Sequence, residues 1–168
     1  MEQREYLQEL CNRYGDFKVA RTWKDTEGNH HWSKHRSVLV CWETEEGLQF
    51  LDCVNHRQIL QNEIIIDLDN KPSEKKFNKV CDAIQKSTCD YAAYSAGRGY
   101  HIHMLIPSKW IHLARMVGLS LDSFRERRIK MFQGDKAKIH TNTMIALEGV
   151  PHWKTGAIKK LIRGKPYV

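Results

Sequence analysis

The most constraining feature of the sequence is a short apolar segment that ends in two aspartates. Residues 63–69 read EIIIDLD, and the three consecutive isoleucines predict a buried β-strand. Asp67 and Asp69 are two positions apart, so a strand places both side chains on one face, with α-carbons about 7 Å apart. Carboxylates on a buried strand are costly unless a positive group neutralises them, and a divalent cation does this directly. Oxygen ligands favour Mg²⁺ or Mn²⁺ over zinc, although the same residues also fit a simple turn before Pro72 that Asp67 caps.

The segments that follow this strand predict an ordered series of elements. A helix is expected after Pro72, and its apolar face would contain Phe77, Val80, Cys81 and Ile84. The remaining segments predict strands over 90–97 and 99–107, a helix over 120–132 and a closing strand over 143–150. This β-α-β-β-α-β order is typical of a ferredoxin-like or RRM-like sheet with helices on one face. The other face is then free to hold a site.

The first third of the chain predicts a smaller α/β unit. A helix is expected from Glu2 to Tyr14, because apolar residues recur at helical spacing and Gly15 follows. Residues 37–54 resemble a β-hairpin that turns around Gly47. We therefore expect an α+β fold with an N-terminal α/β unit over 1–62 and an RRM-like module over 63–168, within a single domain.

Length and composition limit the class of protein. The 168 residues are 41 % hydrophobic, 10 % aromatic and 28 % charged, which is typical of one globular domain and excludes a disordered tail. No apolar run reaches the roughly 20 residues that span a bilayer, and the first ten residues are charged where a secretory signal would be apolar. The prediction is a cytoplasmic protein without a membrane partner.

The five cysteines do not indicate a disulfide framework or a zinc knuckle. Their number is odd and no CxxC pair occurs, so we expect reduced thiols that lie mostly in the core. A looser group of His30, His31, His35 and Cys41 matches no familiar zinc spacing. A polar loop that leads into a strand is the favoured interpretation of that group.

Positive charge is concentrated near the end of the chain. The net charge is +7, and residues 125–168 contain eleven Lys and Arg against three acidic residues, so this quarter alone carries +8. Such a distribution favours contacts with phosphate, although a solvated helix face and a basic tail would give the same pattern. The predicted nucleic-acid contacts are Arg125, Arg127, Arg128, Lys130, Lys159 and Lys160.

A second motif lies between the two predicted strands, in the segment SAGRGYHIH over 95–103. Glycines at 97 and 99 allow a close approach of the backbone to a ligand, and Arg98 offers a planar guanidinium to a phosphate. His101 and His103 share one face of the strand that follows. The motif predicts a phosphate-binding turn, and an ordinary hairpin with two exposed histidines is the alternative.

A third motif is the segment PHWKTG over 151–156, which follows the last predicted strand. His152 and Lys154 beside Gly156 are suited to contact a nucleotide. Asp135 precedes His152 by seventeen residues and would complete a carboxylate triad with Asp67 and Asp69. Taken singly, each of these residues would pass for ordinary loop surface.

Together the three motifs resemble the archaeo-eukaryotic primase (AEP) superfamily, most closely the catalytic small subunit of archaeal and eukaryotic primases. The matching segments are IIIDLD, SAGRGYH and VPHWKTG, and they span 64–156 in the expected order. The resemblance implies that Asp67, Asp69 and Asp135 are the catalytic metal ligands. It also implies nucleotide contacts from the residues Ser95, Arg98, His101, His152 and Lys154.

The resemblance further implies an activity and its partners. The expected reaction is template-dependent nucleotidyl transfer that makes short RNA or DNA primers on single-stranded DNA, with nucleoside triphosphates as substrates and two Mg²⁺ or Mn²⁺ ions as cofactors. A primase large subunit or a helicase is an expected partner. The chain departs from the family where Ala146 replaces a usual Arg or Lys, a contact that Lys138 could supply, and where the cysteine-rich zinc motif of many relatives is missing.

Two other functions remain open from the sequence. His101-Ile102-His103 satisfies the His-hydrophobic-His pattern of HUH-type replication initiators and relaxases, whose nucleophile would have to be Tyr6, Tyr14 or Tyr167. A non-catalytic RRM-like binder would account for the basic charge. The HUH hypothesis leaves the DLD and HWKTG segments unexplained, and the binder leaves carboxylates on a face that meets phosphate.

Overall fold

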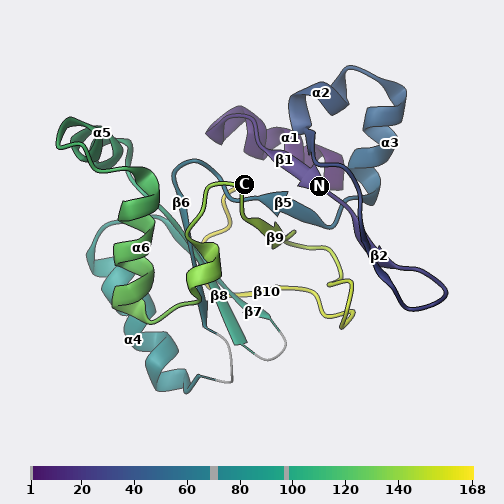
Figure 1. Cartoon of the computed structure of the whole chain (residues 1–168). Helices are drawn as coiled ribbons and strands as arrows, with labels where there is room; N and C mark the ends of the chain where they lie inside the picture. Colours follow the sequence, from purple (N-terminus) through teal and green to yellow (C-terminus); the bar gives the residue numbers. More distant parts are fainter. Residues whose placement is uncertain (1, 69–71, 97–98) are drawn as a thin grey trace. The chain divides into compact units, whose positions relative to one another are not determined.

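The structure is a computed structural model, and it describes residues 2–68, 72–96 and 99–168 (Figure 1). The chain forms two compact units. The first unit contains residues 1–60, 144–158 and 168, and the second contains residues 61–143 and 159–167. The chain therefore leaves the first unit near the predicted boundary at 62, returns to it at 144, and re-enters the second unit at 159. The prediction of a single domain stays a prediction.

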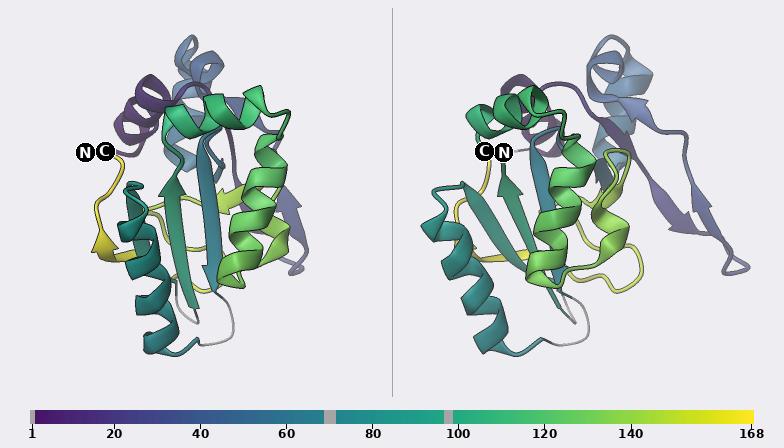
Figure 2. Two further views of the ribbon diagram at one scale, coloured as in Figure 1. Left: turned by 90° about the vertical axis from the view of Figure 1, so that its left-hand side faces the viewer. Right: turned by 60° about the vertical axis from the view of Figure 1, so that its left-hand side comes forward.

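The second unit is built on a four-stranded antiparallel sheet. Its strands are β6 (Glu63–Leu68), β7 (Tyr91–Ala96), β8 (Gly99–Leu105) and β10 (Lys160–Gly164), in the order β10-β7-β8-β6. Helices α4 (Glu74–Lys86) and α6 (Leu121–Phe132) pack on one face of this sheet, and α5 (Ser108–Met116) precedes α6 (Figure 2). The predicted α+β class is confirmed, and β6 lies at an edge of the sheet.

The core between this sheet and its helices follows from the alternation of side chains along the strands. Ile64, Ile66 and Leu68 of β6 point to the same side and are buried. They pack with the buried apolar residues of α4 and α6, namely Phe77, Val80, Cys81, Ile84, Ile129 and Phe132. The helix predicted after Pro72 is confirmed, and it begins where the Ser73 hydroxyl accepts the Lys76 N–H at 3.2 Å.

The predicted closing strand over 143–150 is a correction. Only Met144–Ala146 is a strand, β9, and it pairs with β5 (His56–Gln58) in the sheet of the first unit. The fourth strand of the second unit is β10, which pairs with β7. Its residues KLIRG are mostly exposed and include two cations, so the segment carries the charge of a protected edge strand and lacks a buried-strand pattern.

The first unit contains a second sheet, a separate hairpin and three helices. The sheet has the order β4-β1-β5-β9, where β1 is Lys18–Ala20 and β4 is Arg36–Ser37. The hairpin pairs β2 (Thr22–Lys24) with β3 (His30–Trp32). The first helix, α1 (Gln3–Tyr14), confirms the prediction, with Leu7, Leu10 and Cys11 buried and Gly15 following at a φ of 86°.

The hairpin predicted over 37–54 is wrong, because the segment folds into two helices. These are α2 (Val38–Trp42) and α3 (Glu45–Cys53), and the hydroxyls of Ser37 and Thr44 cap their N-termini. Gly47 serves packing rather than a turn, since a Cβ at this position would lie 2.1 Å from the Cys41 carbonyl oxygen. The apolar run over 38–42 was too short to distinguish a buried strand from a helix by periodicity.

All five cysteines are free, and Cys11, Cys41 and Cys81 are buried. Burial raises the pKa of the Cys81 thiol to about 11. None of the helices in the described part of the chain has both the length and the apolar character that crossing a membrane requires.

Candidate active site

Asp67 and His101 face each other on the side of the sheet that α4 and α6 leave uncovered. They are directly paired residues of β6 and β8, and the sheet alternation turns them away from the Ile64, Ile66 and Leu68 core. The His101 Nε2 atom lies 3.3 Å from the Asp67 Oδ1 atom. The Asp67 side chain is only 7 % exposed and that of His101 is 21 % exposed. A nearly buried carboxylate therefore has an imidazole as its neighbour.

The loop after α6 brings Asp135 to the same point. Gly134 allows a close approach to β6, because a Cβ there would lie 3.2 Å from Cγ2 of Ile66. The Asp135 N–H then donates to the Asp67 carbonyl oxygen at 3.0 Å. Since β6 is an edge strand, its backbone is free to accept this bond. Two of the three predicted metal ligands thus lie side by side.

The short helix η1 (Lys136–Lys138) orders the side chains of this loop. The Asp135 Oδ1 atom accepts the Ala137 N–H at 3.0 Å, and within the described residues no other group bonds the second oxygen. Lys138 points back to the sheet, with its Nζ atom 3.9 Å from Asp67 Oδ2. Lys138 was the residue mentioned above as a replacement for a family cation, and its place beside Asp67 could not be derived from the spacing alone.

These donors fit the divalent cation that the sequence predicts. Asp67 and Asp135 present carboxylate oxygens, which Mg²⁺ and Mn²⁺ prefer, and the low exposure of Asp67 gives a cation a reason to bind there. Asp69 lies outside the described residues. In the described ranges, no group of three or more His, Cys, Asp or Glu residues is arranged as a metal site, so Asp69 would have to complete one.

A second row of polar residues lies beside Asp67 and His101. The His103 Nδ1 atom is 3.2 Å from Glu63 Oε1, and its Nε2 atom is 3.3 Å from Lys159 Nζ. Glu63, His103 and Lys159 are at most 8 % exposed. His101 and His103 do share one face as predicted, but carboxylate and ammonium groups already occupy both ring nitrogens of His103, which disfavours the HUH-type metal site. The burial of Lys159 also corrects its predicted contact with nucleic acid.

Arg125 is a second correction among the predicted phosphate contacts. Its side chain is fully buried, and its guanidinium donates to the backbone carbonyls of Glu63 at 2.9 Å and Gln61 at 2.6 Å. It also donates to Asp122 Oδ1 at 2.9 Å. Burial lowers the pKa of Arg125, although the bond to Asp122 opposes that effect. Arg125 therefore ties α6 to the start of β6 and is not a surface cation.

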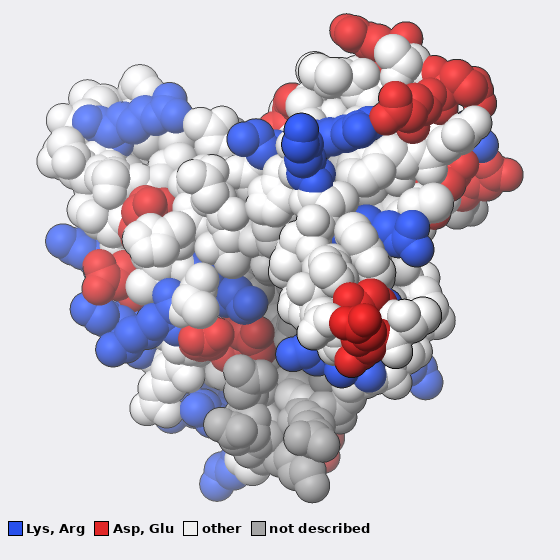
Figure 3. Space-filling view, turned by 45° about the vertical axis from the view of Figure 1, so that its right-hand side comes forward, with Lys and Arg blue, Asp and Glu red and all other residues white. Residues whose placement is uncertain are grey.

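The other predicted cations lie at the surface. Arg127, Lys130 and Lys160 are exposed and Arg128 is half-buried. Lys130 pairs with Glu126 at 2.7 Å, and the Arg128 guanidinium lies 5.3 Å from the centre of the Phe124 ring. Figure 3 shows one face of the molecule, where Lys and Arg occur in several groups with Asp and Glu between them. The excess positive charge is therefore not one continuous band on that face.

The structure does not bring every predicted nucleotide contact to Asp67. Arg98 lies outside the described residues. Ser95 is paired with Tyr100, whose ring stacks on Phe77 of α4 at 4.2 Å between centres. The alternation therefore places Ser95 on the helix side of the sheet, opposite to the side of His101.

His152 and Lys154 belong to the first unit. They lie in a turn in which the His152 carbonyl accepts the N–H groups of Thr155 at 3.2 Å and Gly156 at 2.7 Å. Lys154 is exposed, and its Nζ atom lies 5.0 Å from the centre of the Trp153 ring. Their distance from Asp67 is not fixed by the structure of either unit.

The likeness to a known structure concerns this arrangement of elements. The structure superposes on the AEP domain of the primase-polymerase (PrimPol) of cyanophage S-2L with a TM-score of 0.56, covering 96 % of this chain and 90 % of that chain. The two chains share the AEP fold. Their sequences are 13 % identical over this match. No family model matches the sequence, and no curated protein matches it.

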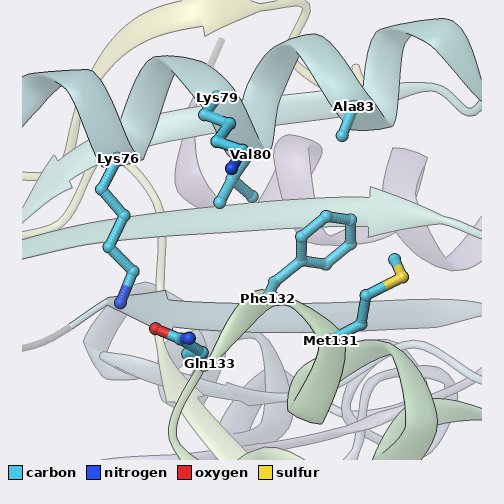
Figure 4. Close-up of a pocket in the computed structure, with 7 residues that line it drawn as sticks. All are labelled: Lys76, Lys79, Val80, Ala83, Met131, Phe132 and Gln133. Atoms are coloured by element: carbon cyan, nitrogen blue, oxygen red, sulfur yellow. The ribbon is translucent and has the colours of Figure 1, made fainter.

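The AEP fold also sets this candidate site apart from a cavity on the helix side of the sheet. That cavity has a volume of about 360 Å³ and lies between α4 and the end of α6. Figure 4 shows Val80, Ala83 and Phe132 around it, with Lys76 extended toward Gln133. None of the predicted site residues lines it, so the cavity is separate from Asp67 and Asp135.

Proposed function

We propose that this chain is a template-dependent nucleotidyltransferase of the primase-polymerase type, within the AEP superfamily. The observation that carries the proposal is the meeting of Asp67 and Asp135, from segments far apart in the sequence, at the open face of the sheet. The AEP fold of the structure supports it. The motifs resemble the small catalytic subunit of primases, and the fold neighbour is a PrimPol.

In this proposal Asp67, Asp69 and Asp135 hold Mg²⁺ or Mn²⁺ through carboxylate oxygens. When bound, the metal supplies activation of the attacking 3′-hydroxyl and neutralises charge on the leaving pyrophosphate. The three carboxylates act as ligands and transfer no proton.

His101 and Lys138 are proposed to orient the triphosphate. Both groups lie next to Asp67, at 3.3 Å and 3.9 Å, so a nucleotide bound there would meet a hydrogen-bond donor and a cation at once. Arg98 would join them from the turn between β7 and β8. His152 and Lys154 are proposed as further nucleotide contacts from the first unit.

The proposed substrates are nucleoside triphosphates and a single-stranded DNA template. The exposed or half-buried cations Arg127, Arg128, Lys130 and Lys160 are proposed to contact template phosphates. A primase large subunit or a helicase is the proposed protein partner.

The test is incorporation of labelled nucleotides on a single-stranded template with Mg²⁺ or Mn²⁺. Asp67→Asn should reduce the rate by at least about 100-fold, because it removes a negative ligand while preserving the shape of the side chain. Asp90→Asn is the matched control, since Asp90 is an exposed aspartate just before β7. Undiminished synthesis by Asp67→Asn would overturn the proposal.

The same assay separates the other two functions. An HUH-type enzyme would form a covalent protein–DNA adduct that disappears on Tyr167→Phe, and a non-catalytic binder would show neither adduct nor synthesis. Either result, with the wild-type protein inactive in incorporation, would contradict the proposed activity.

A further inference from the structure

The first unit contains a hollow of about 330 Å³ that the proposed active site does not use. It lies beside the β2–β3 hairpin and against α3. Its walls combine two arginines, Arg21 and Arg36, with two aromatic rings, Trp23 and Phe50. Aromatic rings interleaved with guanidinium groups are the side chains that bind bases and phosphates of single-stranded nucleic acid.

Trp23 is held in place but remains accessible. It is paired with His31 across the hairpin, and the two rings stack with centres 5.6 Å apart and planes inclined by 22°. The ring of His31 is itself fixed, because its Nε2 atom lies 2.7 Å from Asp25 Oδ2. Even so, Trp23 is 37 % exposed. A base can cover this exposed indole surface at little entropic cost, because the ring is already oriented.

The two arginines differ in how far their charge is already neutralised. The Arg36 guanidinium lies 4.9 Å from the centre of the Phe50 ring and donates to Glu46 Oε1 at 2.9 Å. The Arg21 guanidinium lies 5.7 Å from the centre of the Trp23 ring, and in the described part of the chain no carboxylate pairs with it. Arg21 is exposed and can therefore turn its planar donors toward a phosphate.

We propose that this hollow binds one nucleotide unit of a single strand, with the base on Trp23 and the phosphate on Arg21. The inference rests on the proposed function, because the strand would be the template or its product. A strand fits better than a free nucleoside triphosphate, since three linked phosphates need several cations and only Arg21 lacks a carboxylate partner here. Trp32, on the other face of the hairpin, is 44 % exposed and offers the strand a second aromatic contact.

The first test measures the affinity for fluorescein-labelled oligothymidylate by anisotropy, without nucleotide or divalent metal. Trp23→Ala should weaken binding by roughly 5- to 140-fold, the range expected for loss of one stacked base. Trp110→Ala is the matched control, because Trp110 of α5 is 46 % exposed and also has a cation, Lys109, 5.9 Å from its ring centre. The control should change affinity by less than about twofold.

Arg21→Gln is a second variant that leaves the hairpin aromatics in place. It should weaken binding and reduce the slope of log affinity against log salt by about 1, because one phosphate contact is lost. Unchanged affinity in both Trp23→Ala and Arg21→Gln would overturn the inference. An equal loss in Trp110→Ala would also overturn it, since binding would then follow any exposed tryptophan.

A protection experiment distinguishes a strand from a free nucleotide. Cys53 is exposed and lines the hollow, so its alkylation, followed by peptide mass, reports occupancy. Oligothymidylate should slow alkylation and dTTP should not, whereas protection by dTTP alone would overturn the strand as occupant. Asp67→Asn should bind oligothymidylate as the wild type does, so a failure of nucleotide incorporation and a failure of this inference give different results.

Discussion

The two faces of the sheet in the second unit are made by the same strands and carry opposite chemistry. Toward α4 and α6, β6 presents Ile64 and Ile66 to an apolar core. On the other face it presents Glu63 and Asp67, next to histidines of β8. Both sets of side chains are buried, so exposure does not separate them. The difference teaches that one face provides stability, while the other retains charges that a core would exclude and that only a function explains.

The largest effect on stability is expected at the charged residue on the helix side. Arg125→Ala should lower the free energy of unfolding by about 3–5 kcal/mol, because the carbonyls of Gln61 and Glu63 lose their buried donor. Denaturant titration measures the change. Arg127→Ala, on the exposed surface of the same helix, should stay within about 0.5 kcal/mol of wild type. Equal stability of the two variants would show that Arg125 is not structural.

The neighbouring residues Ile66 and Asp67 compare the two faces most closely. Ile66→Ala should cost about 2–5 kcal/mol of unfolding free energy, the usual range for a cavity in a packed core. Asp67→Asn should change it by less than about 1 kcal/mol, since a neutral amide of the same shape remains beside His101. Thermal and denaturant unfolding measure both. If Asp67→Asn were the more destabilising change, the polar face would be structural and the comparison would fail.

A smaller effect is expected at Lys138, which shares the turn of Asp135. Lys138→Ala should raise the KM for the nucleotide about tenfold and leave kcat nearly unchanged, because it removes binding that is uniform along the reaction. Lys136→Ala is the control, since Lys136 is exposed in the same turn. Steady-state incorporation kinetics measure both constants, and equal KM values in the two variants would remove Lys138 from the site.

The smallest expected effect is the pH dependence of stability at Asp122. Burial alone would raise the pKa of this carboxyl, but hydrogen bonds from Thr141 and Arg125 outweigh it and hold the pKa below its ordinary value of 3.8. A lowered pKa in the folded state stabilises the protein above pH 3.8 and loses that stabilisation as the pH falls through the folded-state value. The stability difference between wild type and Asp122→Asn should therefore shrink on acidification, as unfolding midpoints at several pH values would show. A constant difference would contradict this.

The sequence was most informative where local pattern and tertiary structure agree. The isoleucine run of β6 and the apolar face of α4 have periods that only one structure satisfies, so both were predicted correctly. The segment over 37–54 failed because short apolar runs fit a strand or a helix, and because Gly47 is needed for contact with Cys41 rather than for a turn. β10 was missed because an exposed edge strand has no apolar alternation.

For the site, pairing within one strand was easier to predict than proximity across the chain. Asp67 and His101 belong to motifs whose strands were recognised, and their pairing follows from the register of β6 and β8. Asp135 was assigned by its distance from His152 alone, and its bond to Asp67 depends on how closely Gly134 approaches Ile66. Lys159 and Arg125 were assigned to the surface because charge in a sequence does not show which cations have buried partners.

The central claim is that Asp67 and Asp135 act together at one metal-dependent site. The most direct measurement is the rate of Mn²⁺-dependent nucleotide incorporation on a single-stranded template by Asp135→Asn, compared with Asp67→Asn and with Asp90→Asn. Because both proposed ligands would hold the same metal, each of the first two variants should fall by at least about 100-fold while Asp90→Asn keeps the wild-type rate. Wild-type activity in Asp135→Asn would contradict the account.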